Sequence, residues 1–243
     1  MLQAFNQQQP ETYKALQMKQ LLLLTILCLS TLTLATAQIT RGGGGAFTIG
    51  TQLLPTSELL QFDPSAPELS TSNISIGGYS FFQFNSFVVG MSGSGFYGSE
   101  KTDSRNTYER GGGMFTVDFG YKVVNSPSFS LYPLIGLGAG GFGYSISGLD
   151  DVVIGGDTPA PNESSYNYSS FLFDIGLRFE KTLGYEEGDC GKGAGMVGVE
   201  LGYLMSPSSN EWKTGSGASV INGPEYSMSG FYVRLLIGGF GGF

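Results

Sequence analysis

The sequence ends on FYVRLLIGGFGGF, residues 231–243, a stretch in which apolar residues recur at every second position. Four of them share one parity with the terminal aromatic residue: Phe231, Val233, Leu235, Ile237 and Phe243. Period-two alternation is typical of a β-strand with one apolar face. A long apolar strand at a free edge invites pairing with other chains, and a closed barrel removes that edge by pairing the last strand with the first. The terminal stretch therefore favours a closed barrel.

Seven upstream segments show the same alternation: residues 46–54, 73–84, 86–96, 112–124, 129–144, 168–182 and 194–205. In most of them one parity is apolar and free of charge, whereas the other parity carries glycine, polar residues and a few charges. A membrane barrel turns its apolar parity toward lipid and its polar parity toward the lumen. We therefore expect the following side chains to point outward: Phe115, Phe119, Phe171, Ile175 and Leu235.

The connections between these segments alternate in length. Short ones follow the second, fourth and sixth segments, and long polar ones follow the others, at residues 55–72, 97–111, 145–167 and 206–224. Short turns at one end and long loops at the other are typical of outer-membrane barrels. The sequence therefore predicts an all-β fold, an eight-stranded antiparallel up-and-down transmembrane β-barrel. A soluble lipocalin-like barrel would share the alternation, and a further strand within residues 55–72 or a split of residues 129–144 would raise the count toward ten.

The first 37 residues read as a targeting region. A basic start at Lys19 precedes an apolar run and the small residues of Ala35-Thr36-Ala37, which is typical of a secretory signal with an upstream extension. The start codon could be Met1 or Met18, and an uncleaved anchor is the rival reading. The mature domain would be residues 38–243, whose formal net charge is 10 − 19 = −9. An acidic chain of this kind does not favour nucleic acid as a partner.

The pattern as a whole resembles the small eight-stranded outer-membrane β-barrel proteins of the OmpA/OmpX type. The resemblance rests on the Ala35-Thr36-Ala37 signal ending, the eight alternating segments and the terminal Phe243. It implies a bacterial outer membrane, lipid contact on all sides and both termini in the periplasm. It also implies that the last strand is the signal read by the barrel assembly machinery, through Val233, Leu235, Ile237 and Phe243. No periplasmic peptidoglycan-binding domain is expected.

Charged residues on the inward parity form the candidate site. They are few and of both signs, and we expect them to pair inside the barrel because unpaired charges in a confined interior are costly: Asp118, Lys122, Asp174, Arg178, Glu180, Glu200 and Arg234. If residues 168–182 pair with residues 194–205, Arg178 should lie near Glu200. Such a network could close the lumen, or it could line a gate or narrow ion path. A lumen of eight strands is narrow, which favours closure.

Catalysis is disfavoured because the chain has no histidine. Outer-membrane barrel enzymes of the phospholipase, acyltransferase, deacylase and protease types resemble one another in needing one, and no Ser-His or Asp-His pair can form here. The run Gly136-Leu-Gly138-Ala-Gly140-Gly141 fits G-x-G-x-x-G, but no helical pattern follows it, so we expect no nucleotide. We expect no cofactor and no metal.

The outer loops are then left to carry the function. Trp212 and Tyr226 flank the last loop and are expected at the membrane interface or on a recognition surface. The loop at residues 145–167 is acidic and without Lys or Arg, and matches no calcium motif. The sequence thus predicts a structural or surface-interaction role through four extracellular loops, with an unnamed ligand. A narrow passive channel for small solutes is the main alternative, and a lipid-modifying enzyme is the third.

Overall fold

The computed structural model describes residues 41–148, 163–188, 191–209 and 211–242. The expected signal region, Cys190 and Phe243 lie outside these residues. The described chain is built almost entirely from strands, and no helix in it is long and apolar enough to cross a membrane. Eight of the strands are long: β1 (Arg41–Leu53), β2 (Ser72–Phe84), β3 (Phe87–Gly98), β5 (Asn106–Tyr121), β7 (Phe129–Gly148), β8 (Glu163–Gly188), β9 (Gly191–Met205) and β11 (Gly230–Gly242).

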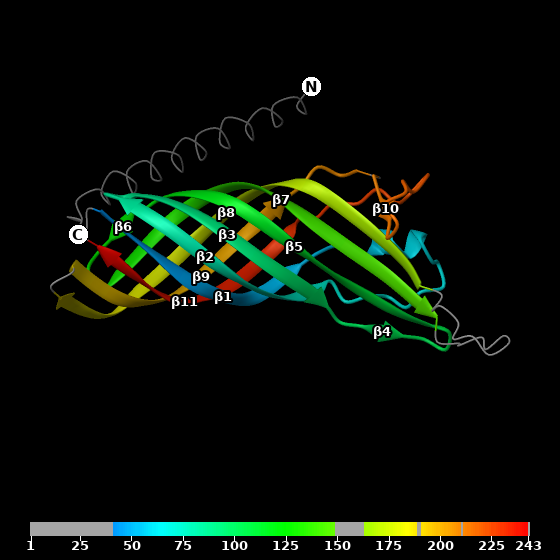
Figure 1. Cartoon of the computed structure of the whole chain (residues 1–243), viewed down its shortest axis with the longest axis horizontal. Helices are drawn as coiled ribbons and strands as arrows, with labels where there is room; N and C mark the ends of the chain where they lie inside the picture. Colours follow the sequence, from blue (N-terminus) through cyan, green and yellow to red (C-terminus); the bar gives the residue numbers. More distant parts are fainter. Residues whose placement is uncertain (1–40, 149–162, 189–190, 210, 243) are drawn as a thin grey trace, which may run out of the picture.

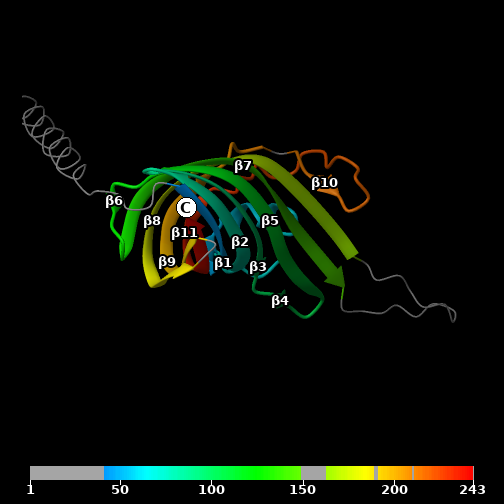
Figure 2. The same ribbon diagram turned by 60° about the vertical axis from the view of Figure 1, so that its left-hand side comes forward.

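The eight long strands form one closed antiparallel barrel, because each pairs with its sequence neighbour and β1 also pairs with β11 (Figures 1 and 2). The register fixes the stagger. Following the register partners of Ile49 around the barrel through β2, β3 and β5 leads to Gly141 on β7. Following them the other way, through β11, β9 and β8, leads to Leu131 on the same strand. The shear is therefore 141 − 131 = 10 residues. Barrels of eight strands with tilts of roughly 35–45° have interiors that side chains fill.

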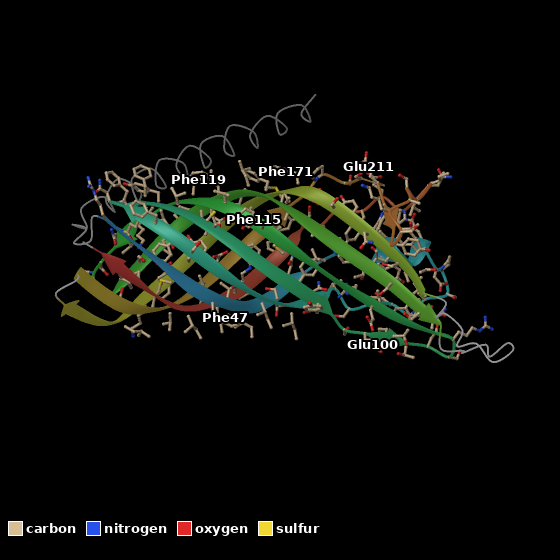
Figure 3. All side chains as sticks on the ribbon, in the orientation of Figure 1. Phe47, Glu100, Phe115, Phe119, Phe171 and Glu211 are labelled. Atoms are coloured by element: carbon tan, nitrogen blue, oxygen red, sulfur yellow. The ribbon has the colours of Figure 1, made fainter. Side chains whose placement is uncertain are left out.

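The outward face of the barrel is an apolar belt. Phe47, Phe115, Phe119 and Phe171 project away from the ribbon in Figure 3, each with about half of its surface exposed, 48–57%. Ile175 and Leu235 are exposed to a similar degree, 48% and 52%. The predicted facing is confirmed, and the lipocalin-like alternative is wrong because a soluble barrel buries its apolar face. The belt leaves this protein with the surface of a membrane-spanning barrel.

The number and order of the long strands are as predicted, but at the loop end β5, β7 and β8 run well beyond the hydrophobic pattern. β5 begins at Asn106, β7 runs to Gly148 and β8 begins at Glu163, so the walls continue beyond the apolar belt. In these extensions the outward positions are Gly, Ser, Thr, Asn and Glu, so backbone pairing continues where apolar alternation stops. Residues 55–71 hold the short 3-10 helix η2 (Ser57–Gln61) rather than a ninth strand.

Three two-residue strands complete the sheet: β4 (Lys101–Thr102), β6 (Val124–Asn125) and β10 (Lys213–Thr214). β4 and β10 lie at the end of the barrel that carries the long loops, together with Glu100 and Glu211, and β6 lies at the opposite end with the short turns (Figures 1 and 3). We call these the loop end and the turn end. The first and last described residues, Arg41 and Gly242, both belong to the turn end, because Gly42 pairs with Gly242.

Candidate functional site

The lumen is filled by three groups of inward side chains. At the turn end, Tyr79, Tyr132, Met196 and Leu236 belong to one buried apolar cluster. At the loop end, a larger cluster is dominated by aromatic rings. Between these clusters lie the charged residues that the sequence singles out. The alternation of inward and outward side chains along each strand brings charged residues from four strands, together with Lys122 directly after β5, into this one confined space.

Arg178 on β8 and Glu200 on β9 form the centre of the charged group. They are direct register partners, and Arg178 Nε donates a hydrogen bond of 2.6 Å to Glu200 Oε2. Arg178 Nη2 also forms an ion pair with the same carboxylate. The guanidinium lies over the ring of Tyr79, with 3.7 Å between its central carbon and the ring centroid. Both charged side chains are almost fully buried, so each depends on the other for compensation.

Tyr232 on β11 connects this pair to Asp174 on β8. Its hydroxyl lies 2.8 Å from Glu200 Oε1 and 2.9 Å from Asp174 Oδ2, and it can donate to one of them at a time. The Tyr232 ring lies across Gly202, where a Cβ atom would come within 2.4 Å of it, so only glycine leaves room for it. Arg234 Nη1 is 3.6 Å from Glu200 Oε1. Glu200 therefore holds two arginines together.

The remaining members extend the group toward the turn end and across the lumen. Lys122 Nζ lies 3.7 Å from Glu180 Oε2 and donates a 2.8 Å hydrogen bond to Gln83. Glu180 also accepts hydrogen bonds from Ser130 and Tyr132. Asp118 accepts a 2.7 Å hydrogen bond from Thr116. The structure thus places all seven residues on the inward face. Arg178, Glu200 and Arg234 are in direct contact, as are Lys122 and Glu180, and Arg178 Nη1 lies 4.0 Å from Glu180 Oε1, which joins the two sets.

A second feature closes the loop end, and the sequence did not predict it. Rings from two loops and two strands pack together into what we call the aromatic cap: Phe62, Phe142, Tyr144, Tyr166, Tyr168, Trp212 and Tyr226. Phe62 stacks on Tyr166 at 4.2 Å between centroids and meets Trp212 edge-on at 5.0 Å. Trp212 donates its indole N–H to the Pro224 carbonyl at 2.8 Å. The aromatic cap closes the lumen of the barrel at the loop end.

The predicted places of Trp212 and Tyr226 are wrong. Both were expected on the surface, at the membrane interface or in a recognition surface, but Trp212 is 1% exposed and Tyr226 is fully buried. The reason is that their loop folds back over the barrel mouth and is fixed there by the Ser209–Tyr226 backbone bridge. Large rings that cannot reach lipid gain more free energy by packing against each other than by remaining exposed to water.

Loop residues 54–71 are tied down at several points. The Leu54 N–H donates to the Thr71 carbonyl at 2.9 Å, and the Thr56 hydroxyl donates to the Leu69 carbonyl at 3.1 Å. Tyr108 on β5 places its hydroxyl 2.8 Å from Asp63. Hydrogen bonds from Ser65 and Tyr108 hold the pKa of Asp63 below its usual 3.8. The loop end is thus a folded surface.

Asp103 follows β4 and approaches the same hydroxyl, at 3.2 Å from Tyr108. The backbone N–H groups of Arg105 and Asn106 donate to it at 2.6 and 2.7 Å and hold the pKa of its carboxyl below 3.8. Within the described ranges, no group of three or more Cys, Asp or Glu residues is arranged to hold a metal ion.

Comparison with known proteins gives the following matches. No protein-family model and no curated protein matches the chain. Among solved structures, the chain is similar to Ail, the attachment invasion locus protein of Yersinia pestis, at 14% identity and a TM-score of 0.44, over 83% of this chain and 99% of that one. A structure of Ail with the heparin analogue sucrose octasulfate gives a TM-score of 0.42 at the same identity and coverage. The outer membrane protease OmpT of Escherichia coli matches at 10% identity and 0.40, over 87% of this chain and 100% of that one.

Proposed function

We propose that this chain is a bacterial outer-membrane protein with a closed lumen, which acts through the surface of its loop end. The observation that carries the proposal is the combination of an outward apolar belt with a lumen filled from end to end. The Arg178–Glu200 pair occupies its middle, and the aromatic cap covers its outer mouth. A pore would need a continuous wet path past both features, and eight strands leave little space for one.

The location follows from the same surface. Closed barrels satisfy every backbone group without water, which is the condition for crossing a bilayer with strands. We propose that residues 1–37 direct export, that both termini lie in the periplasm, and that Val233, Leu235, Ile237 and Phe243 form the signal for barrel assembly. The first three of these side chains point toward lipid on β11, and each has about half of its surface exposed.

A role without catalysis is the proposal that fits the residues best. The chain has no histidine to act as a base, and the buried carboxylates are already occupied by arginine, lysine, tyrosine and threonine partners. The loop end instead offers a folded surface. Among its described residues, the exposed acidic side chains are Glu68, Glu100, Glu109, Glu211 and Glu225, against Lys101, Arg105 and Lys213. A partner with cationic groups would suit this surface.

Two experiments test the proposal. After both native cysteines are replaced by serine, Ile221→Cys at the loop end should react with a membrane-impermeant maleimide in intact cells, whereas Ser128→Cys at the turn end should not. Ile221 is 87% exposed, and Ser128 is also exposed, so a difference reports the side of the membrane. Purified protein in planar bilayers should show no stable conductance steps. Steps of constant size would overturn the closed lumen, and recovery as a soluble periplasmic protein would overturn the membrane assignment.

A further inference from the structure

One inward guanidinium lies apart from the central charges. Arg110 on β5 is close to the loop end and only 4% exposed. Its Nη2 group donates hydrogen bonds to the backbone carbonyls of Ser70 and Ser72, the latter at 3.2 Å. Its Nε and Nη1 groups have no hydrogen-bond partner, and no carboxylate of the described residues forms an ion pair with it. Arg110 is thus a buried positive charge that the described protein does not neutralise.

Two further buried hydroxyls without partners lie in the same part of the lumen. Tyr144 is the register partner of Arg110 on β7, points to the same side of the wall, and leaves its hydroxyl without a partner at 1% exposure. Tyr226 in the aromatic cap is fully buried, and its hydroxyl also has no partner. The Tyr226 ring packs on Phe142, two residues before Tyr144 on β7, with 4.8 Å between ring centroids, so it belongs to the same part of the lumen. Burial raises the pKa of Tyr226, and the Arg110 cation opposes that change.

The chain makes room for this cation. The side chain of Arg110 lies across Gly98 on β3, where a Cβ atom would collide with Nε, Cγ and Cδ. On the outer face of the wall, an open hollow of about 220 Å³ lies over this position and is lined mainly by outward residues such as Tyr97, Glu109 and Ser145. Solvent therefore comes close to this part of the wall from outside, whereas the Arg110 side chain lies on the lumen side and is 4% exposed.

Water alone does not satisfy such a group. Ordered water can pair with the tyrosine hydroxyls, but it does not supply the countercharge that a buried guanidinium needs. A monovalent anion neutralises one positive charge, whereas a divalent anion would leave an excess negative charge in the same buried space. We propose that the inner side of the aromatic cap, at Arg110, Tyr144 and Tyr226, is a binding site for a small monovalent anion of the size of chloride.

This site is coupled to the cap. The guanidinium that would hold the anion also holds the carbonyls of Ser70 and Ser72, where loop 54–71 meets β2. A ligand that binds the folded form alone stabilises it by mass action. The anion should therefore raise the stability of the cap, in a way that depends on Arg110 and saturates with concentration.

Crystals of the wild-type protein soaked in sodium bromide give the direct test. An anomalous bromide peak within contact distance of the Arg110 guanidinium is the expected result. In detergent solution, unfolding followed by Trp212 fluorescence should show a saturable rise of the midpoint, about 2–4 °C, when gluconate is replaced by chloride at constant ionic strength. Trp212 is the only tryptophan, and it lies in the cap with Tyr226.

Variants separate this site from general salt effects. Arg110→Gln should lose the chloride-dependent rise, and Arg110→Lys, which keeps the charge, should keep part of it. Arg105→Gln is the matched control because Arg105 is an exposed arginine in the neighbouring loop, and it should behave like the wild type. A wild-type crystal without bromide at Arg110 would overturn the site whether or not the Arg110 variants fold. An equal chloride effect in wild type and Arg110→Gln would also overturn it.

Discussion

Arg178 and Glu200 face each other across the β8–β9 pair, and the carboxylate of Glu200 also approaches Arg234 on the next strand. One carboxylate therefore compensates two buried cations. Such an arrangement is not strong evidence of stability, since replacing a buried ion pair by apolar residues is often neutral. The clearest consequence of this arrangement is that loss of a single member leaves a buried charge without its countercharge.

Arg178→Met should destabilise the barrel by about 3–5 kcal/mol because Glu200 then keeps only the more distant Arg234 as a countercharge. Glu200→Gln should cost at least as much as Arg178→Met, since it takes the carboxylate from both Arg178 and Arg234. Urea unfolding in detergent, followed by the mobility difference between folded and unfolded protein on a gel, measures both. A Glu200→Gln variant that is clearly more stable than Arg178→Met would contradict this reasoning.

Trp212→Ala should lower stability by about 3–5 kcal/mol, the usual cost of truncating a fully buried large ring. The effect should be concentrated at the loop end, so residues 206–229 should become sensitive to protease while the strands stay resistant. Ile221→Ala serves as the control because this side chain is 87% exposed and contributes no buried surface. Equal protease resistance in Trp212→Ala and the wild type would mean that the cap does not hold these loops.

The loop 54–71 should respond to acid in a defined window. The pKa values of Asp63 and Asp103 are lowered in the folded protein, so their carboxylates stabilise the loop end above the unfolded value of 3.8. That contribution should be constant near neutral pH and disappear as the pH falls below 3.8 through the folded values. Pepsin digestion between pH 5 and pH 2 should therefore begin to cut this loop only below 3.8.

Two variants check the assignment of this acid response. Asp63→Asn removes the charge that accepts the Tyr108 hydrogen bond, and it should make the loop sensitive to pepsin already at pH 5. Glu68→Gln, an exposed change in the same loop, should leave the profile unchanged. A wild-type transition well above pH 4 would point to a different titrating group.

The free energy of unfolding lost when a charged residue is placed on the outward face should depend on its depth within the apolar belt. Leu235→Arg places a cation in the belt on β11 and should cost about 2–4 kcal/mol if the position is near the bilayer midplane. Ser145→Arg, on the part of β7 beyond the belt, should cost less than about 1 kcal/mol. Unfolding in lipid vesicles compares the two, and similar costs would place the bilayer elsewhere on the barrel.

The sequence predicts what repeats with the strand period. Phe115 and Phe171 face outward and Arg178 meets Glu200 because side chains alternate strictly along a strand and the short turn restricts the register. The position of Trp212 was not predictable in this way. It depends on how a loop folds back on rings that lie about 150 residues away, such as Phe62, and no local periodicity carries that information.

The Phe62–Trp212 contact has a consequence for how the barrel opens. Phe62 lies in the connection that follows β1, and Trp212 lies in the connection that precedes β11. β1 and β11 are the first and last strands, so their pairing is the final seam of the closed sheet. The contact bridges that seam from outside the ladder of backbone hydrogen bonds. A chain that unzips from its ends starts at the turn end, where Gly42 pairs with Gly242, and must still part these rings before β1 and β11 can separate. The aromatic cap should therefore slow complete unzipping as well as cover the mouth.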